Sequence, residues 1–202
     1  MQESGSLCVP ELMPLQEEQG RADVYALLAA LLLGPDAQLI ASLAALPRNE
    51  ALQDEPELAW NELLAAAQRC GPQALQEYDA LFIAAGTPRL NPYQCHYLAG
   101  WLMDKPLAAL RDDLRRLGLA RAPGATELED HLGALCETMR VLIASGRSAA
   151  VQQEFFERHL AGWSARCLQD IATAPGADFY RAVATVAQTF FEQEAMHVTT
   201  HP

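Results

Sequence analysis

An Asp-His pair, Asp130-His131, stands in the segment TELEDHLGALCETM, residues 126–139. A carboxylate beside an imidazole can orient it for general base catalysis, and both side chains can also bind a metal ion. The chain offers no nucleophile in a recognisable setting, because it lacks a GxSxG sequence, a phosphate-loop lysine motif, a dinucleotide-binding glycine fingerprint and HExxH. The five histidines are not spaced like metal ligands. We therefore expect neither a catalytic site nor a metal site.

The residues around the pair also fit an ordinary helix, because Thr126 can cap its start and Glu129 follows three residues later, as a capping box requires. We predict a helix over residues 127–144, whose apolar stripe consists of Leu128, Leu132, Leu135, Met139 and Leu142. Asp130 and His131 fall off this stripe. Since an unperturbed histidine has a pKa of about 6.5, we expect the charge of His131 to change close to physiological pH. Spacing alone leaves a local helix cap and a functional pair both open.

Helical spacing of apolar residues extends over almost the whole chain. Alanine and leucine dominate while valine, isoleucine and threonine are scarce, and no segment alternates apolar and polar residues as a strand would. The predicted helices cover residues 15–33, 36–46, 56–69, 73–84, 106–117, 127–144, 148–162, 164–173 and 178–196. We predict an all-α, single-domain bundle of about eight to nine helices over residues 15–197, with a flexible segment at residues 1–14 and a tail at residues 198–202.

The longest predicted loop runs from Ala85 to His96 and contains a glycine and two prolines. Tyr93 and Tyr97 bracket its Cys95-His96 end, and aromatic residues in a proline-containing loop favour a binding role. We expect this loop to lie against the start of the helix at Glu127 and to form one wall of a groove. A hinge that lets two protomers exchange halves is the competing interpretation.

The charge of the chain is strongly acidic, with 26 acidic against 14 basic residues and a formal net charge of −12. Nucleic-acid binding requires a basic face, so we expect no nucleic-acid partner. The start of the chain has no basic and apolar signal segment, and the longest apolar run, residues 24–33, is too short to cross a membrane. Five scattered cysteines without a CxxC indicate free thiols in a reducing compartment. We predict a cytoplasmic protein that is not an integral membrane protein.

Several short motifs in this order resemble the TorD/DmsD/NarJ family of redox-enzyme maturation chaperones, and most of all its TorD/DmsD branch. The family's acidic residue, two spacers and Asp-His correspond to Glu127, Asp130 and His131, followed by an apolar helix that reaches Met139. Upstream motifs of the family correspond to Tyr78, Leu81, Phe82, Pro92, Tyr93 and Tyr97. The segments FFERHLAGW and DFYRAVATVAQTF are similar to the two C-terminal helices of the family.

The resemblance implies an all-helical cytoplasmic chaperone and not an enzyme. Its partner would be the precursor of a molybdenum-cofactor oxidoreductase catalytic subunit, bound through its twin-arginine signal peptide and in some cases through its body. The chaperone would hold this precursor until the cofactor is inserted and then release it for export. Asp130 and Glu127 could pair with guanidinium groups. The implied binding residues are Tyr78, Leu81, Phe82, Pro92, Tyr93, Tyr97, Glu127, Asp130 and His131.

Three alternatives stay open at this stage. Leu81 and Phe82 fit the core as well as they fit an apolar groove. The Asp130-His131 pair could serve an enzyme or a nucleotide-binding protein, since weak guanine-nucleotide binding is suspected in some family members, although no phosphate-binding glycine loop is present and we expect no cofactor. A generic acidic helical scaffold would show no peptide preference. The expected oligomeric state is a monomer, with a domain-swapped dimer if the loop acts as a hinge.

Overall fold

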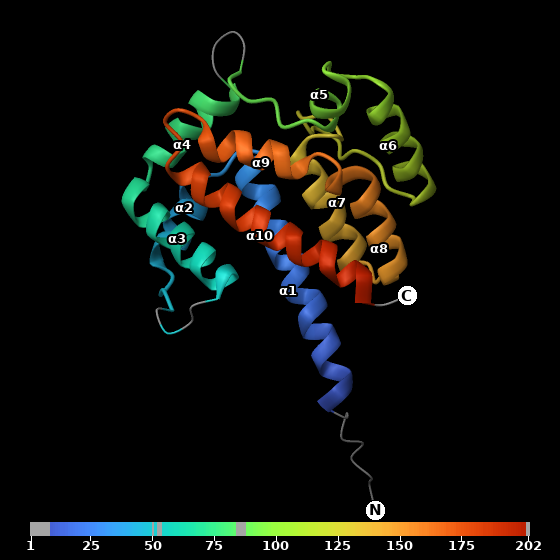
Figure 1. Ribbon diagram of the computed structural model, residues 1–202, viewed down its shortest axis with the longest axis horizontal. Helices are drawn as coiled ribbons and strands as arrows, with labels where there is room; N and C mark the ends of the chain where they lie inside the picture. The colour runs from blue at the N-terminus through green and yellow to red at the C-terminus, as the bar shows by residue number, and fades with distance from the viewer. Residues whose placement is uncertain (1–8, 50, 52–53, 84–87, 201–202) are drawn as a thin grey trace, which may run out of the picture.

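The computed structural model describes residues 9–49, 51, 54–83 and 88–200, and these residues form a helical bundle with a single isolated β-bridge (Figure 1). Its elements are α1 (Val9–Leu32), α2 (Ala37–Ala45), α3 (Glu55–Cys70), α4 (Gln73–Tyr78), η1 (Asp79–Ile83), α5 (Gln94–Ala99), α6 (Lys105–Arg116), α7 (Leu132–Ala144), α8 (Ala149–Phe156), η2 (Glu157–Ala161), α9 (Ser164–Thr173) and α10 (Phe179–Thr200). The two η elements are single π-helical segments. The predicted all-α, single-domain fold is confirmed.

The structure differs from the predicted helices in several places. The predicted helix over 73–84 is α4 followed by the π-helical η1, and the one over 148–162 is α8 followed by η2. A short additional helix, α5, lies inside the predicted loop. It brings the number of described α-helices to ten. Of the predicted flexible segment 1–14, residues 1–8 lie outside the described residues, whereas residues 9–14 belong to α1. Most of the predicted tail belongs to α10.

Aspartate side chains fix the starts of several helices. Asp36, Asp54 and Asp104 each accept a hydrogen bond from a backbone amide in the first turn of α2, α3 and α6. Pro56 and Pro106 follow in the first turns of α3 and α6, where the missing N–H leaves no hydrogen bond unmade. Sequence patterns of this kind are local, which is why these helices begin close to where the sequence predicts.

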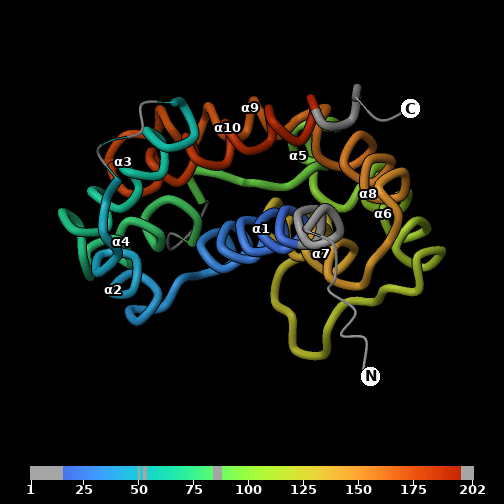
Figure 2. Tube along the Cα trace, turned by 90° about the horizontal axis from the view of Figure 1, so that it is seen from below, coloured from blue at the N-terminus to red at the C-terminus, as the bar shows by residue number. Residues whose placement is uncertain are grey.

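Five helices build the centre of the bundle. α1 packs along α7, while α10 packs along α3 and α9. Figure 2 shows α1 and α7 together on one side and α9 and α10 on the other. At Gly133 the two helices of the first pair approach so closely that a Cβ atom would lie 2.8 Å from Cγ of Leu33 and 3.1 Å from Cβ of Leu32. Only glycine permits this approach at the first turn of α7.

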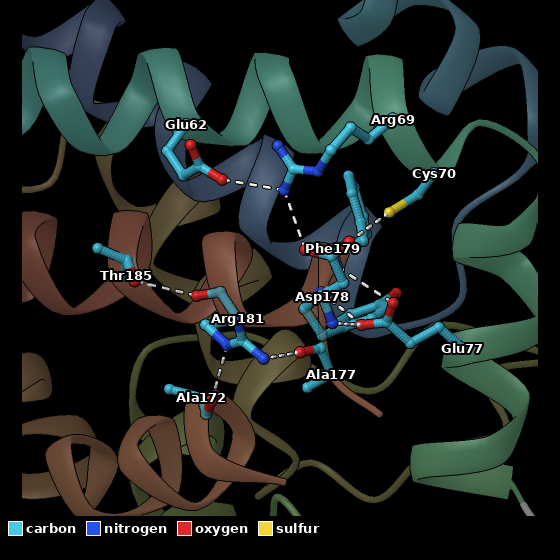
Figure 3. A network of polar contacts seen from close by, with 11 residues as sticks. Glu62, Arg69, Cys70, Glu77, Ala172, Ala177, Asp178, Phe179, Arg181 and Thr185 are labelled. Atoms are coloured by element: carbon cyan, nitrogen blue, oxygen red, sulfur yellow. Dashed lines mark hydrogen bonds and ion pairs between the residues drawn. The ribbon is translucent and has the colours of Figure 1, made fainter. Parts of the chain in front are cut away.

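The start of α10 is held by polar side chains from α3 and α4 (Figure 3). The Glu77 carboxylate accepts hydrogen bonds from the backbone amides of Asp178, Phe179 and Tyr180, at 3.0, 3.1 and 2.7 Å. These amides have no partner within their own helix, and a carboxylate is favoured at a helix start. Arg69 adds an ion pair with Asp178 at 2.9 Å. The first half of the chain thereby fixes where its last helix begins.

Candidate functional site

The Asp130-His131 pair lies where the chain enters α7, not inside a helix. The isolated β-bridge joins Tyr93 to His131, because the amide of Gln94 donates to the Asp130 carbonyl at 2.9 Å and the amide of Leu132 donates to the Pro92 carbonyl at 2.8 Å. This pairing holds the backbone of His131 extended, so a helix cannot pass through it. The predicted helix start at residue 127 is therefore wrong, and α7 begins five residues later with His131 as its cap.

Both side chains of the pair are buried, and each bonds a backbone amide instead of the other. Asp130 is completely buried, and its Oδ2 accepts a hydrogen bond of 3.0 Å from the amide of Cys95, in the first turn of α5. His131 Nδ1 accepts a hydrogen bond of 3.1 Å from the amide of Gly133. The prediction that the two residues lie off the buried face is wrong, because the bridge to Tyr93 turns this segment inward. Their geometry supports positioning of α5 and α7, not a catalytic dyad.

Burial also removes the predicted charge change of His131 near neutral pH. Desolvation lowers the pKa of His131 to about 4, against the opposing effect of the Glu127 and Asp130 carboxylates. The imidazole is therefore neutral at pH 7. The Tyr93 ring packs on it in a T-shaped contact, with ring centroids 4.9 Å apart. This apolar contact adds to the burial that keeps the proton off.

Tyr93 joins the pair to Glu127. The Tyr93 hydroxyl donates a hydrogen bond to the Glu127 carboxylate, and both side chains are half-buried. Burial, followed by this hydrogen bond, raises the pKa of Tyr93 well above its usual range. Burial raises the pKa of Tyr78 to about 12, and Glu127 adds to that rise. Tyr78, Tyr93, Glu127 and His131 thus come together from three separate segments, and Pro92 is buried beside them.

The other predicted binding residues lie elsewhere. Leu81 and Phe82 are buried in the core, where Phe82 packs on Tyr180 with ring centroids 5.1 Å apart. The core interpretation of these two residues is the one that fits the structure. Tyr97 stacks on Trp163 at 5.5 Å, and its hydroxyl donates to Asp170 at 2.9 Å. It therefore packs on α9, apart from the cluster around Glu127.

The segment from Ala85 to His96 is only partly a loop, because α5 begins at Gln94. Its contact with the Asp130-His131 segment is present, through the hydrogen bonds of Pro92 and Gln94 described above. Residues 84–87, on which the hinge interpretation partly falls, lie outside the described residues.

A groove of about 480 Å³ lies beside the cluster, between α7 and the irregular segment that precedes it. Its lining is mainly apolar, with carboxylates along it. The lining residues are Leu33, Leu114, Leu119, Ala120, Arg121, Ala122, Gly124, Ala125, Thr126, Glu127, Glu129, Ala134, Glu137, Thr138 and Val141. The sequence analysis predicted Glu127 at a groove, but the prediction that the segment from Ala85 to His96 forms one wall is wrong for this groove, because none of the described residues of that segment line it. A signal was present in the side of α7 that carries Ala134 and Thr138, but the opposite wall depends on the path of an irregular segment.

The three carboxylates of the groove differ in their partners. Glu129 forms a two-bond ion pair with Arg111, at 3.0 and 2.8 Å, which lowers the pKa of the Glu129 carboxyl. Glu137 forms a similar pair with Arg140, at 2.7 and 2.6 Å. Glu127 bonds the Tyr93 hydroxyl and, among the described residues, has no cationic partner. It is therefore the groove carboxylate that is free to accept a cation from outside.

Two other kinds of feature are absent from the part of the chain that the structure describes. No three His, Cys, Asp or Glu side chains in the described ranges come together in a way that could hold a metal ion. None of the described helices has both the length and the apolar character needed to cross a membrane.

Comparison with known proteins assigns this chain to a family. No curated protein matches the chain. The family model of the nitrate reductase delta subunit matches residues 49–169, more than half of the chain, and this range contains the Asp130-His131 segment and most of the groove. The resemblance to the TorD/DmsD/NarJ chaperones is thereby confirmed, while the TorD/DmsD branch stays a prediction. The chain belongs to the nitrate reductase delta subunit family, whose members are maturation chaperones of molybdoenzymes and not enzymes.

Proposed function

We propose that this chaperone acts in the cytoplasm, where it binds the twin-arginine signal peptide of a molybdenum-cofactor oxidoreductase in the groove beside α7. A signal peptide of this kind combines an arginine pair with an apolar segment. The groove offers the complementary chemistry, because an apolar surface from Leu33, Ala134 and Val141 runs beside carboxylates. The chaperone would hold the precursor until its cofactor is inserted and then release it for export.

The observation that carries this proposal is the Glu127 carboxylate at the edge of an apolar groove, which has no cationic partner among the described residues. A guanidinium can form two parallel hydrogen bonds with a carboxylate, which an ammonium cannot. Tyr93, whose hydroxyl already bonds Glu127, holds the carboxylate in place for such a partner. Glu129 and Glu137 are less available, because each would have to give up its own arginine first.

The roles proposed for Asp130 and His131 follow from their burial. They do not touch the peptide in this proposal, but fix the Pro92-Tyr93 segment against the start of α7. Tyr93 and Glu127 then keep their relative position. The mature part of the precursor would be bound only in addition to the signal peptide.

The test is to measure the affinity for a twin-arginine peptide by fluorescence anisotropy in Glu127→Gln, with Glu137→Gln as the matched control. Both substitutions remove one negative charge from the groove and keep the side-chain size. We expect Glu127→Gln to weaken binding about tenfold, which corresponds to about 1.4 kcal/mol, and the control to weaken it no more than about twofold. A twin-lysine peptide should bind the unmodified protein less tightly than the twin-arginine peptide. Equal losses in the two variants, or no loss in either, would contradict the proposal.

A further inference from the structure

Exposed apolar side chains gather in one short segment outside the groove. Four of the nine large apolar side chains that are exposed in the described part of the chain lie within residues 98–103. They are Leu98, Trp101, Leu102 and Met103, which we name the apolar patch, and Trp101 and Met103 are 75% and 72% exposed. None of the four lines the groove. Exposed apolar side chains that stand singly are ordinary, whereas a group of them marks an interaction site.

The backbone of the apolar patch is fixed at both ends. Gly100 ends α5 with a φ angle of +80°, and its amide donates a hydrogen bond to the His96 carbonyl at 3.1 Å. Asp104 caps the start of α6 with its side chain. The Cys95 thiol donates to the Asp104 carbonyl at 3.7 Å, which ties the end of the patch to the first turn of α5. The patch is therefore held in its exposed position between two anchored ends.

Met103 has an unfavourable backbone conformation. Its φ angle of +58° lies in the left-handed region, and it is the only residue other than glycine with a positive φ among those described. A side chain is strained in this region, and glycine would relieve the strain. Backbone strain of this kind is concentrated at functional sites. The position thus keeps a large, exposed apolar side chain where local stability favours none.

The apolar patch adjoins the site proposed for the signal peptide. Tyr93, whose hydroxyl bonds Glu127, directly precedes α5, and the patch begins with Leu98 in the same helix. Because α5 has six residues, its length along the axis is only about 9 Å. An extended peptide covers this distance with about three residues. One peptide can therefore contact both Glu127 and the patch.

The groove is too small for the whole apolar segment of a signal peptide. Such a segment has roughly 7–15 residues. A volume of about 480 Å³ is in the range that holds one drug-sized molecule, which corresponds to a few side chains. The remaining apolar residues need a second surface, and the patch offers one within reach of the next few residues.

The charge of the chain favours a basic peptide over other apolar partners. A formal net charge of −12 opposes association with a second copy of the chain and with an anionic lipid surface. The same charge attracts a peptide that carries arginines. Charge complementarity thus indicates the same partner for the patch as for the groove.

We infer that the apolar patch is a second binding surface for the signal peptide, where it binds the apolar residues that extend beyond the groove. This inference rests on the proposed function. The arginine pair lies at Glu127 and the far part of the apolar segment lies at the patch, so one peptide links the two contacts. Trp101 is the anchoring side chain, because a large exposed aromatic ring gains most from burial.

The test uses two peptides with the same arginine pair, one with its complete apolar segment and one in which the second half of this segment is replaced by serines. Leu98→Gln is compared with Leu58→Gln, because these leucines are 51% and 49% exposed, on helices α5 and α3 that lie towards opposite ends of the molecule (Figure 1). We expect the complete peptide to bind about threefold less tightly to Leu98→Gln and about tenfold less tightly to Trp101→Gln, with no change in Leu58→Gln. The serine-substituted peptide should bind all three variants equally.

Met103→Gly separates binding from folding. Glycine adopts this φ without strain, which offsets its greater freedom in the unfolded chain, so the free energy of unfolding should change little. The affinity for the complete peptide should nevertheless fall about threefold, because an apolar contact is lost. If Met103→Gly, Leu98→Gln and Trp101→Gln all bind this peptide as tightly as Leu58→Gln does, the inference is overturned while the proposed function stands.

A third peptide, with both arginines replaced by glutamine and the apolar segment complete, separates this inference from the proposed function. It should bind weakly, and Trp101→Gln should weaken it about tenfold further. If Glu127→Gln leaves the arginine peptide unaffected while Trp101→Gln weakens both complete peptides, the proposed role of Glu127 fails and the patch stands. A dimer, or binding to neutral phosphatidylcholine vesicles, that Trp101→Gln abolishes without changing peptide affinity would assign the patch to another partner and overturn the inference.

Discussion

The Asp130-His131 segment and the groove beside it are neighbours in the chain with opposite physical characters. The pair is buried and bonded to backbone amides of α5 and α7. The groove is open, and its Glu127 bonds one hydroxyl while keeping room for a cation. Residues that stand out in a sequence as chemically unusual can thus be the ones that hold a site in place. In the proposed function the ligand is bound by Glu127, a neighbouring residue of a common type.

The largest expected effect is that of His131→Ala on stability. Its absence would contradict the buried character of the Asp130-His131 segment. Removal of the buried ring leaves a cavity against Tyr93 and an unbonded amide at Gly133, so we expect a loss of about 2–4 kcal/mol in the free energy of unfolding. Chemical denaturation would measure this loss. His96→Ala, at an exposed position, serves as the control and should cost less than about 0.5 kcal/mol. A His131→Ala protein as stable as the control would contradict the burial of His131 and would support the position off the buried stripe that the sequence predicts.

The next effect is a dependence of stability on pH. His131 has a pKa of about 4 in the folded chain, below its value of about 6.5 when unfolded, so the unfolded state binds more protons between these pH values. The contribution of a neutral His131 is therefore fully present above about pH 6.5 and is lost as the pH falls towards 4. At pH 5 we expect this loss to be on the order of 1–2 kcal/mol.

Measurement of the difference between the unmodified protein and His131→Gln at pH 7.5 and pH 5 isolates this contribution from other groups. The gap in unfolding free energy should narrow at the lower pH. A gap that stays constant would show that His131 takes up its proton as readily in the folded chain as in the unfolded one, and would contradict its burial.

The smallest expected effect concerns the groove, because it tests the charge of the Glu127 carboxylate. Attraction between Glu127 and a guanidinium at the groove edge is screened by salt, so the affinity for a twin-arginine peptide should fall several-fold between 50 and 500 mM salt. Apolar contacts with the groove should leave a residual affinity. The Glu127→Gln protein should show a weaker dependence on salt than the unmodified protein. The same dependence in both would assign the attraction to the overall acidic charge of the chain.

The fold was largely predictable because most helices are specified locally, by apolar spacing and by caps such as Asp36. The start of α7 was not, although Thr126 and Glu129 form a valid capping box in the sequence. Backbone pairing of residues 130 and 132 with residues 92 and 94 outweighs a local cap, and this pairing joins segments far apart in the chain. Glu127 was predicted as a binding residue, whereas its lack of a cationic partner among the described residues depends on tertiary structure, which pairs Arg111 with Glu129 and Arg140 with Glu137. The wall of the groove formed by residues 119–126 likewise depends on tertiary structure.

The central position of α1 and α10 bears on when this chain can fold during synthesis. The buried Glu194 of α10 bonds Arg21 and Tyr25 of α1, and Glu77 caps the start of α10 from α4. While α10 is still unmade, Arg21 and Tyr25 lack their buried partner and the faces of α3 and α9 that pack on α10 are exposed. A chain growing on the ribosome therefore cannot complete its core until residue 194 has emerged. The bundle is accordingly completed only after α10 has been made, and a polypeptide terminated before Phe179 would leave these faces of α3 and α9 uncovered.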